Sequence, residues 1–224
     1  MKKLCKYLLW SLLILSSSQA YANWQSWYSK DNLSISYQKQ ASGLILIKAQ
    51  ASFDNVNRQA FLNLLNDTQS APEWLSNVRS VKSLPWHIKG ENIVVTVLNA
   101  PWPVKDRVML THSCHRLVSE ATSRLLIKSI DESKRAEFLP LEQFKKYIFV
   151  APIEGSWLLE ETSNTLLITH QIYADPQGKI PAWLSNKTAL KGVKKTFQNM
   201  AQRIYKKEYQ ADNNFITSSC STFE

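Results

Sequence analysis

The sequence predicts an α+β fold in which a curved antiparallel sheet wraps around one long C-terminal helix. Strand patterns dominate residues 78–173, with weak alternation of apolar and polar residues at 78–88 and a strongly β-branched run at 93–98. Only short turns separate these segments, which favours antiparallel neighbours. One long pattern of helical period follows at 182–207. A sheet with a single major helix buries its apolar face by curling around that helix, so we predict a grip-like arrangement.

Residues 1–22 have the pattern of a cleaved secretory signal. Three lysines lie among the first six residues, an apolar run covers 7–15, and Ala20-Tyr21-Ala22 forms an A-x-A cleavage site. The apolar run is far shorter than the roughly 20 residues that span a bilayer. We therefore expect an exported chain that begins at Asn23, with an uncleaved membrane anchor as the alternative.

The start of the mature chain predicts a hairpin followed by a helix. Residues 33–37 alternate between apolar and polar, and the apolar run at 44–51 reads as the partner strand. Apolar residues then recur at helical spacing over 56–65, where we expect Asp54 or Asn55 to cap the helix.

The rest of the chain predicts strands and then the long helix. The expected strands are 78–88, 93–98, 107–118, 122–130, 144–150, 155–160 and 165–173. Prolines and a glycine at 174–181 end this pattern. The helix at 182–207 has an apolar stripe that consists of Leu190, Val193, Phe197, Met200, Ala201 and Ile204. We expect one domain over 23–207 and a disordered polar tail at 208–224.

The composition argues against several classes of function. The formal net charge is +9, but the chain is expected to be exported and carries no nucleic-acid recognition motif, so we expect no nucleic-acid partner. The five glycines leave little room for a phosphate-binding loop, and neither a G-x-S-x-G nor a zincin motif occurs. We expect no cofactor. The lysines of 182–207 indicate a solvated helix face or contacts to anionic lipid head groups.

Two cysteines follow the predicted signal, Cys114 and Cys220. Export would allow a disulfide between them; the alternative is a buried thiol in a strand and a separate thiol in the tail. His112 and Cys114 share one face of the predicted strand, while His115 points to the other. No third ligand is identified, so we expect no metal site.

The loop Asn99–Arg107 is the most distinctive local feature of the sequence. Pro101 and Pro103 remove two backbone donors and fix two φ angles, so this segment cannot be a central strand. We expect a stiff loop that holds Trp102 between the prolines and ends in an adjacent acid and base.

Three motifs, in this order along the chain, resemble the StAR-related lipid-transfer (START) family in its bacterial exported form. Pro101-Trp102-Pro103 followed by Asp106-Arg107 resembles the family's Pro-Arg-Asp-type motif, although Val108 replaces the usual Asp. Gly155-Ser156-Trp157 resembles a late strand in which the family places a Trp. Residues 175–184, DPQGKIPAWL, resemble the family's Asp-Pro-x-Gly-x-Ile-Pro run into the last helix. Order and spacing agree over 24–205.

The resemblance implies a helix-grip fold that encloses a tunnel for one hydrophobic, lipid-like molecule in the periplasm. In that family the loop before the Arg strand and the last helix act as a lid, and here these are 99–105 and 180–204. Strand alternation and the family register together select the inner face of the central strands. The expected ligand-binding residues are Val94, Thr96, Leu98, Trp102, Arg107, Met109, Thr111, Trp183, Val193 and Phe197.

These residues also have purely structural interpretations. Arg107 could pin the loop through an ion pair with Asp106 or another acid, and the stripe of the last helix is explained by core packing alone. Trp102 and Trp183 could pack on the sheet edge or dip into a bilayer interface. Rival functions are an enzyme, for which His115 with Arg107 is the only candidate pair, and an interaction module with a filled core. We expect a monomeric, non-catalytic binder with transient membrane contact.

Overall fold

The computed structural model describes residues 23–100, 102–213 and 215–223. The predicted signal at 1–22 and Pro101 of the predicted loop therefore lie outside the described residues. Within the described part of the chain, no helix is both long and apolar enough to cross a bilayer.

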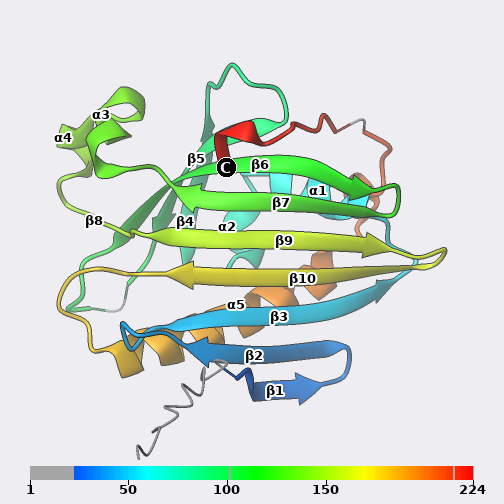
Figure 1. Ribbon diagram of the computed structural model, residues 1–224, viewed down its shortest axis with the longest axis horizontal. Coiled ribbons are helices and arrows are strands. Elements are labelled where there is room, and N and C mark those ends of the chain that lie inside the picture. Colours follow the sequence, from blue (N-terminus) through cyan, green and yellow to red (C-terminus); the bar gives the residue numbers. More distant parts are fainter. Residues whose placement is uncertain (1–22, 101, 214, 224) are drawn as a thin grey trace, which may run out of the picture.

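A ten-stranded sheet forms the body of the protein (Figure 1). Its strands are β1 (Gln25–Lys30), β2 (Leu33–Lys39), β3 (Ile45–Asp54), β4 (Val78–Leu84), β5 (Glu91–Leu98), β6 (Arg107–Ser119), β7 (Thr122–Ser129), β8 (Ile148–Phe149), β9 (Ile153–Glu161) and β10 (Thr165–Ala174). The order across the sheet is β1-β2-β3-β10-β9-β7-β6-β5-β4, and β8 adds to β6. All pairs along this path are antiparallel, and the β6–β8 pair is parallel. The sheet is open, with β1 and β4 as its edges.

In the described part of the chain, five α-helices and three short 3-10 helices complete the fold. The α-helices are α1 (Arg58–Asn66), α2 (Ala71–Trp74), α3 (Arg135–Phe138), α4 (Leu141–Phe144) and α5 (Ala182–Arg203), and the 3-10 helices are η1 (Glu132–Lys134), η2 (Lys207–Tyr209) and η3 (Ser221–Phe223). In Figure 1, α5, α1 and α2 lie behind the sheet, whereas α3 and α4 lie together at one end of it. The predicted α+β helix-grip arrangement is confirmed.

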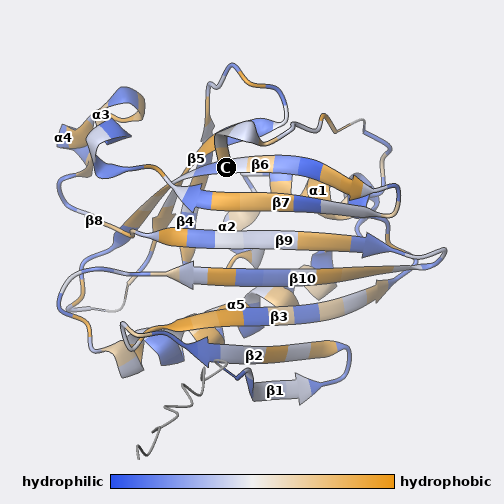
Figure 2. Ribbon diagram, in the orientation of Figure 1, coloured by the Kyte–Doolittle hydropathy of each residue, from blue (hydrophilic) through white to orange (hydrophobic). Residues whose placement is uncertain are grey.

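The main core lies between the sheet and the helices behind it. Along β3 every second residue is buried, and Figure 2 shows the matching alternation of apolar and polar residues. From α5, Leu190, Phe197 and Met200 enter the same core, which confirms much of the predicted stripe. Burial of a large apolar side chain contributes about 1.5–3 kcal/mol, so this stripe is the main reason that the helix stays on the sheet.

A second apolar cluster covers the opposite face of β5 and β6. Ile93, Val95 and Val97 of β5 pack there with Val108 and Leu110 of β6, under side chains from the 138–149 segment. The other face of β5, with Val94, Thr96 and Leu98, is half-buried, so burial along this strand alternates although its sequence is largely apolar.

Several boundaries differ from the sequence-based prediction. The expected strand at 144–150 is reduced to two residues, because α4 occupies its start and 138–149 serves as the cover of the second cluster. The last helix ends at Arg203 rather than at 207, since the backbone turns there into η2. The cap of α1 is Asn57, whose side chain accepts a hydrogen bond from the Ala60 N–H at 2.9 Å, and neither expected residue caps it.

The prediction of a disordered tail is wrong for the described residues. Cys220 forms a disulfide with Cys114 of β6, with the two Cα atoms 5.7 Å apart. Beside it, the Ser218 N–H donates to the His115 carbonyl at 2.8 Å. Gly90, at φ +80°, lies so close to the tail that a Cβ there would come within 2.6 Å of the Thr217 carbonyl carbon. The polar composition that suggested disorder instead supplies hydrogen bonds along the sheet.

We predict that the disulfide contributes about 2–4 kcal/mol to the free energy of unfolding, because it closes a loop of 106 residues in the unfolded chain. Urea unfolding of the oxidised protein should show this loss on addition of a dithiol reductant. Cys220→Ala should have the same free energy of unfolding as the reduced wild type, and the reductant should not change it. Equal stability of the oxidised and reduced protein would contradict the prediction.

Candidate functional site

An apolar cavity of about 380 Å³ lies between the sheet and the N-terminal part of α5. Its walls come from the starts of β3 and β6, the ends of β5 and β10, the middle of β9 and two loops. The residues that line it include Ile45, Ile47, Leu98, Arg107, Met109, Trp157, His170, Ile172, Leu184, Ser185, Ala189 and Val193. The cavity is therefore mostly apolar, and its polar lining comes from Arg107, from the Trp157–His170 pair and from neutral Asn, Ser and Thr side chains.

The structure brings Leu98, Arg107, Met109 and Val193 together around this cavity, as the sequence predicted. The register explains the first three. Leu98 pairs with Arg107 across β5 and β6, and Met109 follows two residues further on the same face. Whether these residues contact a ligand stays a prediction.

The other strand residues of the predicted set share this face but do not line the cavity. Val94 pairs with Thr111 and Thr96 with Met109, so the predicted orientation is confirmed. However, the strand contacts of α5 are chiefly to β2 and β3, at the other side of the sheet. The middle of β5 therefore lies outside the space that the helix encloses.

Three aromatic residues of the predicted set are also not cavity residues. Trp102 is 92% exposed and Trp183 is 66% exposed, so neither packs on the sheet edge. Phe197 is buried one turn beyond Val193, where it packs against Trp157 at 5.9 Å between ring centroids. It belongs to the main core beyond the cavity and also borders a second hollow, which is open to solvent.

Sequence reasoning missed the wall formed by β3 and β10. Ile45 and Ile47 alternate along β3, and His170 and Ile172 alternate along β10. The same period-two rule that selected Met109 could have found them. It was not sufficient alone, because only the strand order places β3 beside β10.

Arg107 is buried, with 5% of its surface exposed, and is held by backbone carbonyls. Its Nε donates to the Pro176 carbonyl at 3.3 Å, its Nη2 donates to the Gln177 carbonyl at 3.2 Å, and its Nη1 donates to the Lys105 carbonyl. Burial lowers the pKa of Arg107 and nearby Asp106 opposes this, and the guanidinium stays charged at neutral pH.

The alternative in which Arg107 forms an ion pair with Asp106 is wrong. Asp106 faces Arg79, with Oδ2 2.7 Å from Nη2, and accepts the Ala100 N–H at 2.9 Å. These two donors lower the pKa of Asp106, the Ala100 N–H most strongly. The acid therefore fastens the start of the proline loop, and Arg107 is left to fasten its end.

Arg107 also joins two motifs that are almost 70 residues apart in sequence. Its guanidinium fits under the turn at 176–178, where Gly178 has φ +77°. A Cβ on Gly178 would lie 3.5 Å from Nη2 of Arg107 and 3.2 Å from Cδ1 of Ile148. A side chain at this position would be strained by the backbone and crowded by both neighbours.

Trp157 and His170 form the inner end of the cavity. Their rings stack at 3.7 Å between centroids with an interplanar angle of 15°, and the His170 Nδ1–H donates to the Ser156 carbonyl at 3.1 Å. Burial lowers the pKa of His170 to about 4. The imidazole is therefore neutral at pH 7 and places no charge at this end.

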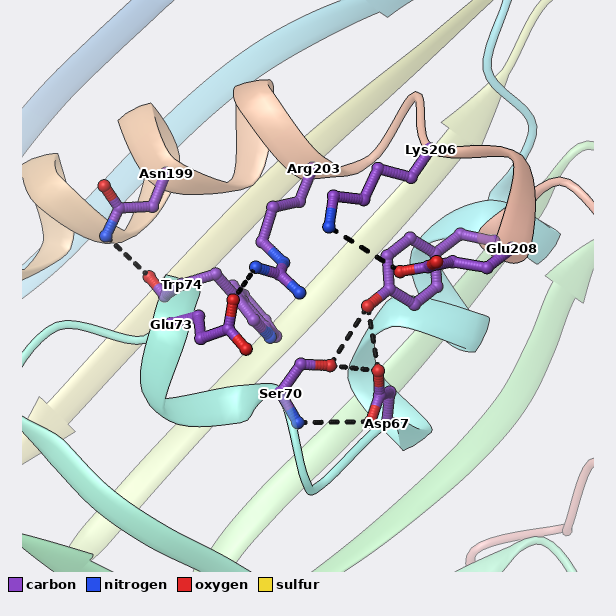
Figure 3. Close-up of polar contacts among 9 residues, drawn as sticks. Asp67, Ser70, Glu73, Trp74, Asn199, Arg203, Lys206 and Glu208 are labelled. Carbon is purple, nitrogen blue, oxygen red and sulfur yellow. Dashed lines mark hydrogen bonds and ion pairs between the residues drawn. The ribbon is translucent and has the colours of Figure 1, made fainter.

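The C-terminal end of α5 is anchored by polar contacts to the α1–α2 region (Figure 3). Arg203 forms an ion pair with Glu73, and the Asn199 side chain donates to the Trp74 carbonyl at 3.3 Å. Just beyond the helix, the Tyr209 hydroxyl donates to Asp67 Oδ2 at 2.8 Å. Hydrogen bonds from Ser70, and then from Tyr209, lower the pKa of Asp67, so the acceptor is ionised at neutral pH.

Other polar regions of the described chain do not form a comparable site. A larger hollow of about 790 Å³ lies between the second half of α5 and the β1–β2–β3 part of the sheet, but Lys30, Lys191, Lys194 and Lys195 line it and it is open to solvent. Among the described residues, no group of three potential metal ligands occurs. Arg107 and His115 lie eight residues apart on β6, which separates them by roughly 26 Å along the strand. The only sequence-derived candidate for a catalytic pair is thus not brought together.

We predict that stability depends on pH through His170. Its pKa in the folded protein is about 4, below the ordinary value of 6.5, so the unfolded chain binds the proton more tightly. The contribution is complete above about pH 6.5 and is lost as the pH falls toward 4, by up to about 3 kcal/mol. Urea unfolding at a series of pH values should show that the free energy of unfolding falls more steeply toward pH 4 in the wild type than in His170→Phe. Parallel pH profiles for the two proteins would contradict it.

No family model matches this chain. START domain-containing protein 10 of Mus musculus is 24% identical over 199 residues, which cover 88% of this chain and 63% of that protein. The human protein of the same name is 23% identical over the same length. The chain thus spans less than two thirds of the length of these relatives.

Solved structures give a fuller match. A STAR-related lipid transfer protein from Xanthomonas axonopodis superposes with a TM-score of 0.71 at 18% identity, covering 82% of this chain and 99% of that one. Human STARD10 gives a TM-score of 0.71 at 20% identity, covering 84% and 76%. The fold expected from the three motifs is confirmed, and the bacterial exported type stays a prediction. The chain has the helix-grip fold of a START domain.

Proposed function

We propose that this protein binds a hydrophobic, lipid-like molecule in the cavity beneath α5 and carries it through an aqueous compartment of the cell envelope. The observation that carries the proposal is the cavity itself: an aliphatic space of about 380 Å³ under a helix, within the size range of ligand sites. Each methylene removed from water contributes about 0.8 kcal/mol, which is sufficient to hold an acyl chain there. The relatives named above are lipid-transfer and START proteins, which supports the same choice.

Ligand entry requires movement of the N-terminal part of α5. The C-terminal end is tied down by the Arg203 and Tyr209 contacts. The N-terminal end is held more lightly, through a hydrogen bond of 2.9 Å from Asn186 to the Gly43 carbonyl and a contact of Ala182 with the same turn. We propose that this end and the loop before β6 open together, because Arg107 links that loop to the turn preceding the helix.

The two exposed tryptophans favour loading at a membrane surface. Trp102 lies between Ala100 and Val104, and Trp183 lies next to Leu184; these three neighbours line the cavity. A tryptophan at the rim suits the interface of a bilayer, because the body of its ring is apolar and its N–H can contact water. With the signal predicted at 1–22, we propose a periplasmic, monomeric shuttle that contacts membranes transiently.

We propose a binding role without catalysis. Arg107 is engaged by three carbonyls, and His115 lies far from it along the same strand. The polar groups of the cavity therefore serve to close and orient rather than to transfer protons.

We predict that Val193→Trp abolishes ligand binding, because Val193 faces the cavity and a large ring would fill it. Native mass spectrometry of the exported full chain should show co-purified lipid on the wild type and none on the variant. Lys187→Trp adds the same ring to an exposed position of the same helix and should keep the lipid. A wild-type protein that never carries lipid, or a Val193→Trp variant that carries as much, would refute the proposal.

A further inference from the structure

The cavity has an open polar end and a closed apolar end. Arg107 lies at the open end, beside the loop and turn that frame the mouth. Trp157 lies at the other end, and it pairs across β9 and β7 with Leu125, which pairs with His115 of β6. His115 is eight residues from Arg107 along β6, so Arg107 and Trp157 lie on widely separated rows of the sheet.

Packed aromatic rings close the inner end. Trp157 is only 4% exposed and contacts the ring of Phe61 of α1 at 5.0 Å and that of Phe197 of α5 at 5.9 Å between centroids. His170 stacks on its remaining face. Phe61 and Phe197 do not line the cavity, because the Trp157–His170 pair separates them from it. A ligand chain that enters from the mouth must stop at this pair.

The walls of the cavity are mostly apolar. Ile45, Ile47 and Ile172 line it from the neighbouring strands β3 and β10, and Ala189 and Val193 line it from the helix. Its volume of about 380 Å³ lies near the lower limit of about 300–1,000 Å³ for small-molecule sites. A space of this volume suits one acyl chain rather than two.

We infer that the protein takes an amphiphile with a single acyl chain, whose methyl end abuts the Trp157–His170 pair and whose polar head stays near the mouth. This inference rests on the proposed function, since it names the class of ligand for the same cavity. The aromatic pair limits the length of chain that the cavity accepts, and the small volume of the cavity excludes a second chain.

The test compares two lipids that share a head group and differ in the number of chains. Lysophosphatidylcholine and the diacyl phosphatidylcholine with the same acyl chain are titrated at equal concentration against the full chain, below the micellar range of the former. We expect the single-chain lipid to bind at least tenfold more tightly. Equal or tighter binding of the diacyl lipid overturns the inference while the proposed function stands; failure of both lipids, and of a free fatty acid, overturns both.

A ladder of chain lengths tests the wall directly. Affinity for lysophosphatidylcholines should rise about fourfold per added methylene and then stop rising once the methyl end reaches Trp157. Trp157→Leu should move that limit to longer chains, whereas Trp74→Phe, at a buried tryptophan outside the cavity, should not. The ladder on the unaltered protein keeps the test valid if Trp157→Leu fails to fold. An affinity that rises without limit, or a limit that both variants leave unchanged, overturns the inference.

Discussion

The burial of one guanidinium group between three backbone carbonyls organises the region on which the function depends. Arg107 begins β6, and its donors reach the loop before that strand and the turn that leads into α5. A buried charge must be compensated, and here the compensation comes from peptide dipoles rather than from a carboxylate. The loop and the turn are therefore held in a fixed position relative to each other, although nearly 70 residues separate them. Loss of this group would leave three carbonyls unpaired at the mouth of the cavity.

The division of the apolar surface into two clusters leaves space for a cavity. The second cluster covers the outer face of β5 and β6, so these strands do not depend on α5 for burial. The helix can then pack firmly through its C-terminal half, at Phe197 and Met200, while its N-terminal half spans a space instead of filling it. Stability and binding are thus assigned to different parts of one helix, and the part that must move is the part with fewer anchors.

The sequence predicted the architecture well because period-two and helical patterns are local properties. The helix stripe, the inner face of β6 and the cross-strand partners of Met109 and Thr111 all follow from alternation. The cavity walls at Ile47 and Ile172 could not be predicted so directly, since they depend on β3 lying next to β10. The partner of Arg107 could not be predicted either, because backbone carbonyls leave no trace in residue type. The tail was misjudged for the opposite reason: its polar composition resembles disorder, but one covalent bond to Cys114 holds it.

The central claim is that ligand occupies the space beneath the N-terminal half of α5. Hydrogen–deuterium exchange of the full chain, with and without saturating lysophosphatidylcholine and in parallel with diacyl phosphatidylcholine vesicles, tests it most directly. We predict that a bound lipid slows exchange over 182–193 and over the loop before β6, while 197–209 exchanges equally slowly in every state. Protection confined to the lysine-lined hollow between β1–β2–β3 and the second half of α5, or no change with either lipid, would contradict the claim.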